Sequence, residues 1–329
     1  MSRWYSITPA GTVAIGNLTP VGQNSGQVGC RWPPNGHHLA ACLKLPSNCQ
    51  IWGPFWYKGE GNIYVTLPLP VYRLESKTEE LPQEIFRLQW RDGQWQKQSE
   101  HQEQEIEIIG GRYLIRGNTL KTFWQAGKLK NPQLQKFPWQ TLTLSHNSRE
   151  DYQVKDEGGF FAEMTTLMSP GWSILVKVMG DCKLDEWGFL GAGGTPVAIA
   201  PVEIKEDWLT ADCPNPTGAV LLTGALWQQG SSGTLSSKVS CPVPPLPIKA
   251  YAADTGVPWQ SWKKVKHRDE KDNPNAEKRV EVFTPGEWMT PAGAVYLWEG
   301  TAPLLKSEPL PDAYHRHVLG YGHLWLFQE

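Results

Sequence analysis

The 329-residue sequence lacks several features that would assign it to a class at once. No run of 18 apolar residues occurs, so we expect no transmembrane helix. The first nine residues, Met1–Pro9, have no basic segment followed by an apolar one, so we expect no secretory signal peptide. The six cysteines lie far apart and include no C-x-x-C pair. They predict reduced thiols in a cytoplasmic protein, without a disulfide framework or a zinc knuckle.

Motifs of the common catalytic sites are also absent. The sequence contains no G-x-S-x-G, H-E-x-x-H or G-x-x-x-x-G-K-[ST] pattern, and no carboxylate cluster stands beside a histidine. His315 and His317 are spaced to share one face of a strand, with His323 further on, but they lack partners at metal-ligand spacing. We therefore predict no metal, no cofactor and no catalytic residue.

Acidic residues are missing from two long runs. Residues 1–59 contain no Asp or Glu against four Lys and Arg, and residues 108–149 contain none against seven. The formal net charge of −2 hides this segregation. Because carboxylates repel phosphates, such runs are typical of surfaces that bind a polyanion. Aromatic residues alternate with the basic ones, as in proteins that bind single-stranded nucleic acid, although the core is the more common place for any single aromatic side chain.

The 17 Trp, 27 Pro and 32 Gly predict many short strands rather than long helices, because Pro and Gly interrupt helices. A helix is expected within residues 31–44, after two prolines that suit its first turn. Shorter helices are expected at 159–168 and 185–190, and a charge-dense loop at 262–279. Strands are predicted at residues 4–8, 62–67, 173–178, 196–200, 218–222, 247–251, 293–298 and 323–327.

The chain length suits two average domains or one large β-rich domain. We expect an N-terminal domain over residues 1–150, with an insertion around 73–149 in which residues 86–90 form a hairpin arm. A C-terminal domain is expected over residues 151–329. Both halves follow a strand–helix–strand order, which predicts two α+β modules placed side by side.

Five short motifs resemble one known family by their order along the chain. They are Trp4-Tyr-x-Ile-Thr-Pro9, Trp32-Pro-Pro-x-Gly with the small-residue helix to Lys44, Gly188–Gly194, Thr290–Tyr296, and Gly320-Tyr-Gly322. The sequence resembles the RAMP superfamily, and within it the subunits that bind the 5′ handle of the guide RNA in type III-B CRISPR effector complexes, the third subunits of the Cmr module.

The resemblance implies an α+β fold of two ferredoxin-like (RRM-like) domains with β-rich insertions and glycine-rich loops. It also implies a part in antiviral defence, in which the chain holds RNA without cutting it. The partners it implies are the 5′ handle of a guide crRNA, the large polymerase-like CRISPR subunit and the adjacent RAMP backbone subunit, with no membrane.

Candidate RNA-binding residues come both from the pattern of charges and glycines and from the family resemblance. Arg31, Asn35 and Lys44 flank the expected helix, whose start favours an anion, or they belong to a solvated helix face. Glycine-rich turns let a backbone approach a phosphate, or are ordinary turns that need positive φ. The predicted set is Arg31, Asn35, Lys44, Arg112, Arg116, Lys121, Lys128, Gly191, Gly193, Gly194, Gly320, Tyr321 and Gly322.

Two other functions stay open at this point. One is a metal-independent endoribonuclease of the same superfamily that processes guide RNA, with His37, His38 or His315 as the general base. The other is a carbohydrate-binding β-protein that uses its tryptophans as sugar platforms, which explains the composition but not the charge segregation.

Overall fold

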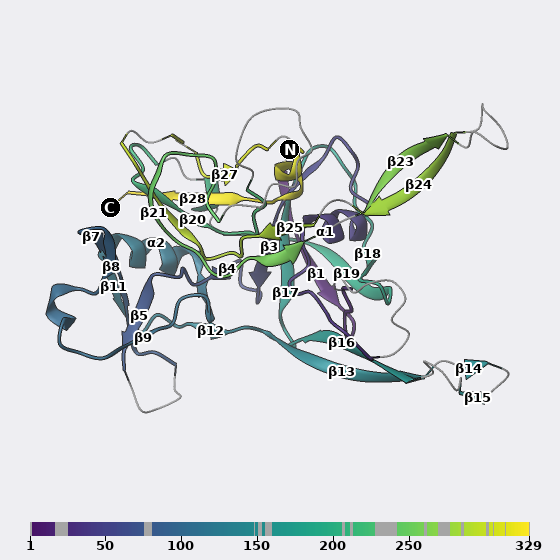
Figure 1. The fold of residues 1–329 in the computed structure, drawn as a ribbon, viewed down its shortest axis with the longest axis horizontal. Coiled ribbons are helices and arrows are strands. Elements are labelled where there is room, and N and C mark those ends of the chain that lie inside the picture. The colour runs from purple at the N-terminus through teal and green to yellow at the C-terminus, as the bar shows by residue number, and fades with distance from the viewer. Residues whose placement is uncertain are drawn as a thin grey trace.

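Two packed β-sheets, with arms that extend from one end, make up the fold in the computed structural model (Figure 1). All statements below concern the residues that the structure describes. These are 2–16, 26–75, 81–147, 149–150, 153–154, 160–205, 208–210, 213–227, 242–259, 262–268, 277–283, 286–300, 303–304, 306–312 and 314–328.

The larger sheet has eight strands, and every neighbouring pair in it is antiparallel. In spatial order its strands are β12 (Gln135–Lys136), β10 (Tyr113–Arg116), β4 (Ile63–Thr66), β3 (Gln50–Tyr57), β17 (Ser173–Met179), β1 (Ser2–Pro9), β19 (Thr195–Val202) and β18 (Trp187–Leu190). Strands β17 and β19 lie on either side of β1. A domain boundary near residue 150 would therefore separate β1 from β17 and β19, although the three strands are neighbours in one sheet.

Four of these strands, in the order β3-β17-β1-β19, repeat the order of a split β-α-β unit, in which the second, third, first and fourth strands are neighbours. Helix α1 (Gly36–Cys42) makes the first crossover, from β1 to β3, which confirms the helix expected after the two prolines. The second crossover contains strand β18 where a helix was expected at 185–190. That expectation was wrong, because alternate burial of Trp187-Gly-Phe-Leu190 on a sheet satisfies this segment better than a helix.

The smaller sheet has the same order without helices among its described residues. Its strands are β21 (Ile248–Ala252), β26 (Val295–Trp298), β20 (Gly218–Leu221), β28 (His323–Phe327) and β27 (Glu308–Pro309). All its neighbouring pairs are antiparallel. Between β26 and β28, the described residues contain strand β27 and a short 3-10 turn, η3 (Arg316–Leu319), but no α-helix. The six strands predicted in the second half of the sequence are all confirmed.

The two sheets bury a common core. Phe55 and Leu175, from one face of the large sheet, belong to the same apolar cluster as Val295 and Phe327 of the small sheet. The opposite face of the large sheet forms a second cluster, in which Leu39 of α1 packs against the sheet. A helix on one face and a sheet on the other leave both faces of the central strands buried.

The stretch 73–149 does not form a separate insertion, because it contributes β10 and β12 to the large sheet. It also supplies most of a four-stranded sheet and a helix that the sequence did not predict, α2 (Gly117–Ala126). The four-stranded sheet consists of β11 (Lys128–Lys130), β6 (Glu84–Arg87), β5 (Val71–Leu74) and β9 (Ile106–Ile108). The expected hairpin arm is the pair β7 (Gln89–Arg91) and β8 (Gln94–Gln96), which precedes the turn η1 (Ser99–His101).

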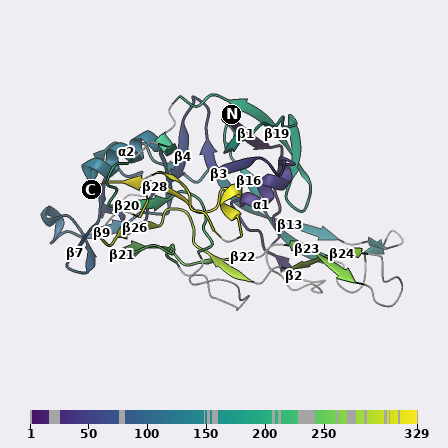
Figure 2. The same ribbon diagram turned by 90° about the horizontal axis from the view of Figure 1, so that it is seen from above.

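Two long hairpins extend from one end of the molecule in both views (Figures 1 and 2). One pairs β13 (Trp139–Asn147) with β16 (Phe160–Met168), along which β2 (Gly26–Val28) also lies. The other pairs β23 (Trp262–Arg268) with β24 (Glu277–Phe283). The expected helix at 159–168 and the expected loop at 262–279 were therefore wrong where these strands run. The remaining short elements are β14 (Arg149–Glu150), β15 (Gln153–Val154), β22 (Val257–Trp259), β25 (Glu287–Met289) and η2 (Trp208–Thr210).

Candidate nucleic-acid interface

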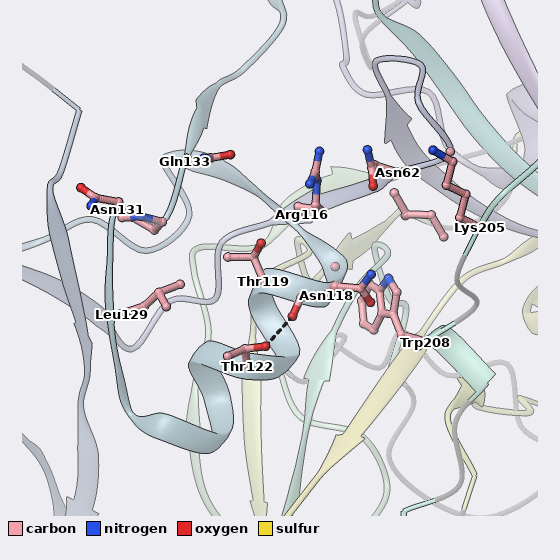
Figure 3. Close-up of a pocket in the computed structure, with 14 residues that line it drawn as sticks. Asn62, Arg116, Asn118, Thr119, Thr122, Leu129, Asn131, Gln133, Lys205 and Trp208 are labelled. Atoms are coloured by element: carbon pink, nitrogen blue, oxygen red, sulfur yellow. Dashed lines mark hydrogen bonds between the residues drawn. The ribbon is translucent and has the colours of Figure 1, made fainter.

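A pocket of about 490 Å³ opens at the start of helix α2 (Figure 3). Its walls come from the turn before β4, from the first turn of α2, from the loop after β11, and from the segment that follows β19. The lining residues are Gly61, Asn62, Ile63, Arg116, Gly117, Asn118, Thr119, Thr122, Leu129, Asn131, Pro132, Gln133, Lys205 and Trp208. No carboxylate is among them.

The first turn of α2 points its positive end into this pocket. Arg116 is the N-cap residue, no side chain makes a capping hydrogen bond there, and the first turn contains no acid. An uncapped helix start presents backbone N–H groups and a partial positive charge to an anion. Gly117 is required at this turn, because a Cβ atom there would collide with the indole of Trp208.

Trp208 lines the pocket, and its indole packs against Gly117. It is 6% exposed, and its Nε1 atom has no hydrogen-bond partner among the described residues. Figure 3 shows the indole beside the first turn of α2. A buried N–H without a partner costs about 1 to 3 kcal/mol, so a ligand acceptor that reaches it is favoured by a similar amount.

Two cations stand at the mouth. Arg116 and Lys205 come from different walls, and Figure 3 shows their charged ends, with the amide of Asn62, on the same side of the pocket. Glu60 is the nearest acid recorded for Arg116, at 3.8 Å, and its side chain is 81% exposed. Because an exposed ion pair at this distance is weak, it leaves Arg116 available for a phosphate. The arrangement suits an oxyanion held by cations, amides and one indole donor.

Arg116 is the one predicted RNA-binding residue that lies in this pocket. Lys121 lies exposed further along α2. The other predicted cations stand next to carboxylates: Lys44 is 2.9 Å from Asp185, Arg112 is 2.8 Å from Glu107, and Lys128 is 3.7 Å from Glu100. The runs that are free of acids in the sequence are therefore not free of acids in space, since Arg116 also has Glu60 at 3.8 Å.

Arg31 and Asn35 make contacts inside the fold. The side-chain oxygen of Asn35 caps α1 by accepting hydrogen bonds from the backbone N–H groups of His37 and His38. The Nε atom of Arg31 donates to the carbonyl of Gly16 at 2.9 Å. In this conformation both side chains organise the entry to α1.

The Gly320–Gly322 loop is packed rather than open. The backbone N–H groups of Gly320, Tyr321 and Gly322 donate to the carbonyls of His317, Arg316 and Gly224, at 3.0, 3.4 and 3.0 Å. Gly320 has φ of 83°, and a Cβ atom there would lie 2.6 Å from the carbonyl oxygen of Gly53. The loop's amides are thus occupied, and its glycines are needed for close packing.

The Gly191–Gly194 segment forms the turn between β18 and β19. Gly194 donates to the carbonyl of Gly191 at 3.2 Å, and a Cβ atom at Gly191 would collide with the carbonyl of Ala14. Gly193 and Gly194 are exposed and open, with no atom within 4 Å of a Cβ at either position. Only the tip of this turn is accessible to a ligand.

The histidines considered for catalysis or metal binding lie in different surroundings. His37 is partly buried, and desolvation, followed by the charge of Arg316, lowers its pKa to about 4. Desolvation, followed by the charge of Arg31, lowers the pKa of His38 to about 4 as well. The rings of His315 and His317 lie 5.9 Å apart. Among the described residues no group of three His, Cys, Asp or Glu side chains is placed to hold a metal ion, and no helix is long and apolar enough to cross a membrane.

Sequence reasoning missed most of the pocket. Lys205 and Trp208 lie beyond residue 150, in the half assigned to a second domain, and reach α2 only because β19 belongs to the first sheet. Asn62 stands in a short turn without a distinctive pattern. The one usable signal was Gly117, which follows Arg116 directly and permits the close approach of Trp208.

Comparisons with known proteins give a weak structural likeness. No family model and no curated protein sequence matches the chain. Two similar solved structures are cryo-EM structures of the type III-B Cmr-beta complex. One, bound to cognate target RNA and AMPPnP, aligns with a TM-score of 0.44 and 8% identity over 90% of this chain and 86% of that chain. The other, bound to cognate target RNA, aligns with a TM-score of 0.43 and 11% identity over 98% and 96%. At these values the likeness alone does not establish fold or function.

Proposed function

We propose that this chain is a non-catalytic RNA-binding subunit of a type III CRISPR effector complex. It anchors the 5′ handle of a guide crRNA, and it contacts the large polymerase-like subunit and an adjacent RAMP backbone subunit. Its two sheets, which share the order of the split β-α-β unit, are two ferredoxin-like domains in which α1 is the one crossover α-helix among the described residues. The order of the five sequence motifs supports this family.

The observation that carries the proposal is the pocket at α2. Two cations and an uncapped helix start converge, beside one buried indole N–H, on a site whose described lining residues include no acid. A phosphodiester group matches this set, because it offers charge and several acceptors at once. Its volume of about 490 Å³ exceeds what a single phosphate needs, so part of the attached nucleotide also enters.

Filter binding at increasing salt tests the proposal with two RNAs, one with the repeat-derived 5′ handle and one of equal length without it. We expect tighter binding of the handle RNA, and an affinity that falls with salt in proportion to the phosphates contacted. Equal affinity for both RNAs would exclude handle recognition, and an affinity independent of salt would exclude binding through the RNA phosphates.

A second assay tests the absence of catalysis. The protein is incubated with repeat RNA in EDTA, and the products are resolved on a denaturing gel. Intact RNA is the expected result. Discrete cleavage that disappears in a His37→Gln or His315→Gln variant would favour the endoribonuclease instead.

A further inference from the structure

The outer face of the hairpin β18–β19 is exposed and entirely apolar. Trp187 and Phe189 are 60% and 54% exposed, and their rings meet edge to face with centroids 5.4 Å apart. Pro196, Ala198 and Ala200 are exposed beside them, and the register places Ala198 opposite Trp187 and Pro196 opposite Phe189. We call these five residues the β18–β19 face. Contiguous apolar surface of this kind is typical of an interaction site.

This face continues a surface that is buried elsewhere in the molecule. Along the same side of the large sheet, Leu175 and Phe55 are covered by the small sheet. The opposite side of β18 and β19 is also covered, because Leu190, Val197 and Ile199 belong to the cluster that packs against α1. The β18–β19 face is therefore the part of this sheet side that no described residue covers.

Within the described part of the chain, strand β18 also stands at the edge of the sheet and pairs only with β19. An edge strand carries backbone N–H and C=O groups that a further strand can pair with. An extended segment beside β18 would add main-chain hydrogen bonds and place alternate side chains over Trp187 and Phe189.

The charges around the face select the class of partner. No Lys or Arg is among its residues, and the segment before β18 exposes three acids, Asp181, Asp185 and Glu186, against one cation, Lys183. Lys44 is held by Asp185 at 2.9 Å. A polyphosphate meets no cation on this face and faces carboxylates at its border, whereas a protein segment with apolar and basic side chains meets complementary groups.

We propose that the β18–β19 face docks an adjacent protein subunit, which lays an extended segment with alternate apolar residues and flanking Lys or Arg along β18. The proposal rests on the proposed membership of a multi-subunit complex, but it needs no RNA contact by this chain. The face is separate from the pocket at α2, so the two can be disabled one at a time.

Photo-crosslinking tests the identity of the occupant. Phe189 is replaced by p-benzoyl-phenylalanine in the tagged chain, the assembled complex is purified and irradiated, and the crosslinked product is sequenced by mass spectrometry. We expect one peptide of another protein subunit, with Lys or Arg within a few residues of the crosslink. Tyr251, which is 47% exposed on β21, carries the same probe as a matched control and is expected to give no crosslink to that peptide. A crosslink from position 189 to RNA, to a second copy of this chain, or to nothing in an intact complex overturns the proposal.

Substitution measures the contribution of the face. The double variant Trp187→Ser with Phe189→Ser should lower the affinity for the crosslinked subunit about tenfold or more, as expected for exposed aromatic anchors, while Tyr251→Ser has no effect. Both variants should keep the thermal midpoint and the salt-dependent RNA affinity of the wild type. If the double variant binds the subunit as tightly as the wild type does, the docking site is wrong. If the wild-type chain does not bind RNA, only the proposed function is wrong.

Discussion

The Nδ1 atom of His37 lies 2.9 Å from the hydroxyl oxygen of Tyr321, across 284 residues of sequence. Trp259 donates its Nε1–H to the same hydroxyl at 3.1 Å, which leaves the Tyr321 O–H free to donate to Nδ1 of a neutral His37. One buried hydroxyl thus joins helix α1 to strand β22 and to the Gly320–Gly322 loop. Because Nδ1 of His37 accepts this bond, the imidazole is neutral in the folded chain, in agreement with its pKa of about 4.

A stability that falls below neutral pH follows from the burial of His37 and from the nearby charge of Arg316, which together lower its pKa. Between the ordinary pKa of 6.5 and the folded value of about 4, the unfolded chain binds a proton at His37 that the folded chain does not bind. The free energy of unfolding therefore decreases as the pH drops through this window, by about 3 kcal/mol for one such group. Thermal unfolding monitored from pH 7 to pH 4 measures the effect.

The His37→Gln variant separates the contribution of His37 to the pH dependence from that of the other titratable groups. Its amide oxygen can accept from Tyr321 but does not titrate, so its thermal midpoint should depend less steeply on pH than that of the wild type. His315→Gln, at an exposed position, serves as the control and should keep the wild-type slope. An unaltered slope in His37→Gln would show that the contact does not hold the neutral imidazole.

Gly320 should prove essential for stability rather than for RNA contact. Alanine at this position combines a positive φ with a contact of 2.6 Å to the Gly53 carbonyl, and we expect a loss of about 2 to 4 kcal/mol. Gly193→Ala is the matched control, because no atom lies within 4 Å of its Cβ, and it should stay within about 0.5 kcal/mol of the wild type. Urea unfolding measures both. A stable Gly320→Ala variant that loses RNA affinity would contradict this assignment and restore the RNA contact predicted from the sequence.

Strands could be predicted from the sequence where the pattern of β-branched and aromatic residues is strong and local. The Ser173–Met179 and His323–Phe327 segments are examples, and both form central strands. Phe160–Met168 was assigned wrongly to a helix, because its conformation is fixed by a nine-residue ladder with Trp139–Asn147. Such a pairing partner is not visible in the segment itself.

The distribution of charge along the sequence did not predict the site well, because folding brings together charged residues that are far apart in the chain. Lys44 and Asp185 are 141 residues apart and 2.9 Å apart, so the first acid-free run acquires an acid by folding. The pocket shows the reverse effect, because Lys205 joins Arg116 from a distant segment. Both outcomes depend on the position of β19 in the large sheet, which no local pattern specifies.

The two cations of the pocket should each contribute to RNA affinity. Removing one phosphate contact reduces the salt slope by about 0.7 for single-stranded RNA, so Arg116→Gln and Lys205→Gln should each lower this slope and weaken binding about tenfold at low salt. The RNA affinity of Arg116→Lys should lie between that of these two variants and that of the wild type, because lysine keeps the charge but lacks the planar guanidinium group. Lys249→Gln, an exposed position on β21, is the charge-matched control. Slopes that are the same in the control and in the pocket variants would place the RNA elsewhere.

The indole N–H of Trp208 should act as a ligand donor, and a second tryptophan makes this testable. Trp124 is also buried, at 1% exposure, and its Nε1 likewise has no hydrogen-bond partner among the described residues, but it does not line the pocket. Trp208→Phe and Trp124→Phe remove the same N–H and the same ring volume, so both should lower the thermal midpoint. Only Trp208→Phe should also weaken RNA binding, by about tenfold, because a hydrogen bond to a charged oxygen contributes about 1.5 to 3 kcal/mol. Inorganic phosphate should accordingly raise the thermal midpoint of Trp124→Phe more than that of Trp208→Phe. Equal affinities of the two folded variants for RNA would mean that the indole N–H does not meet a phosphate.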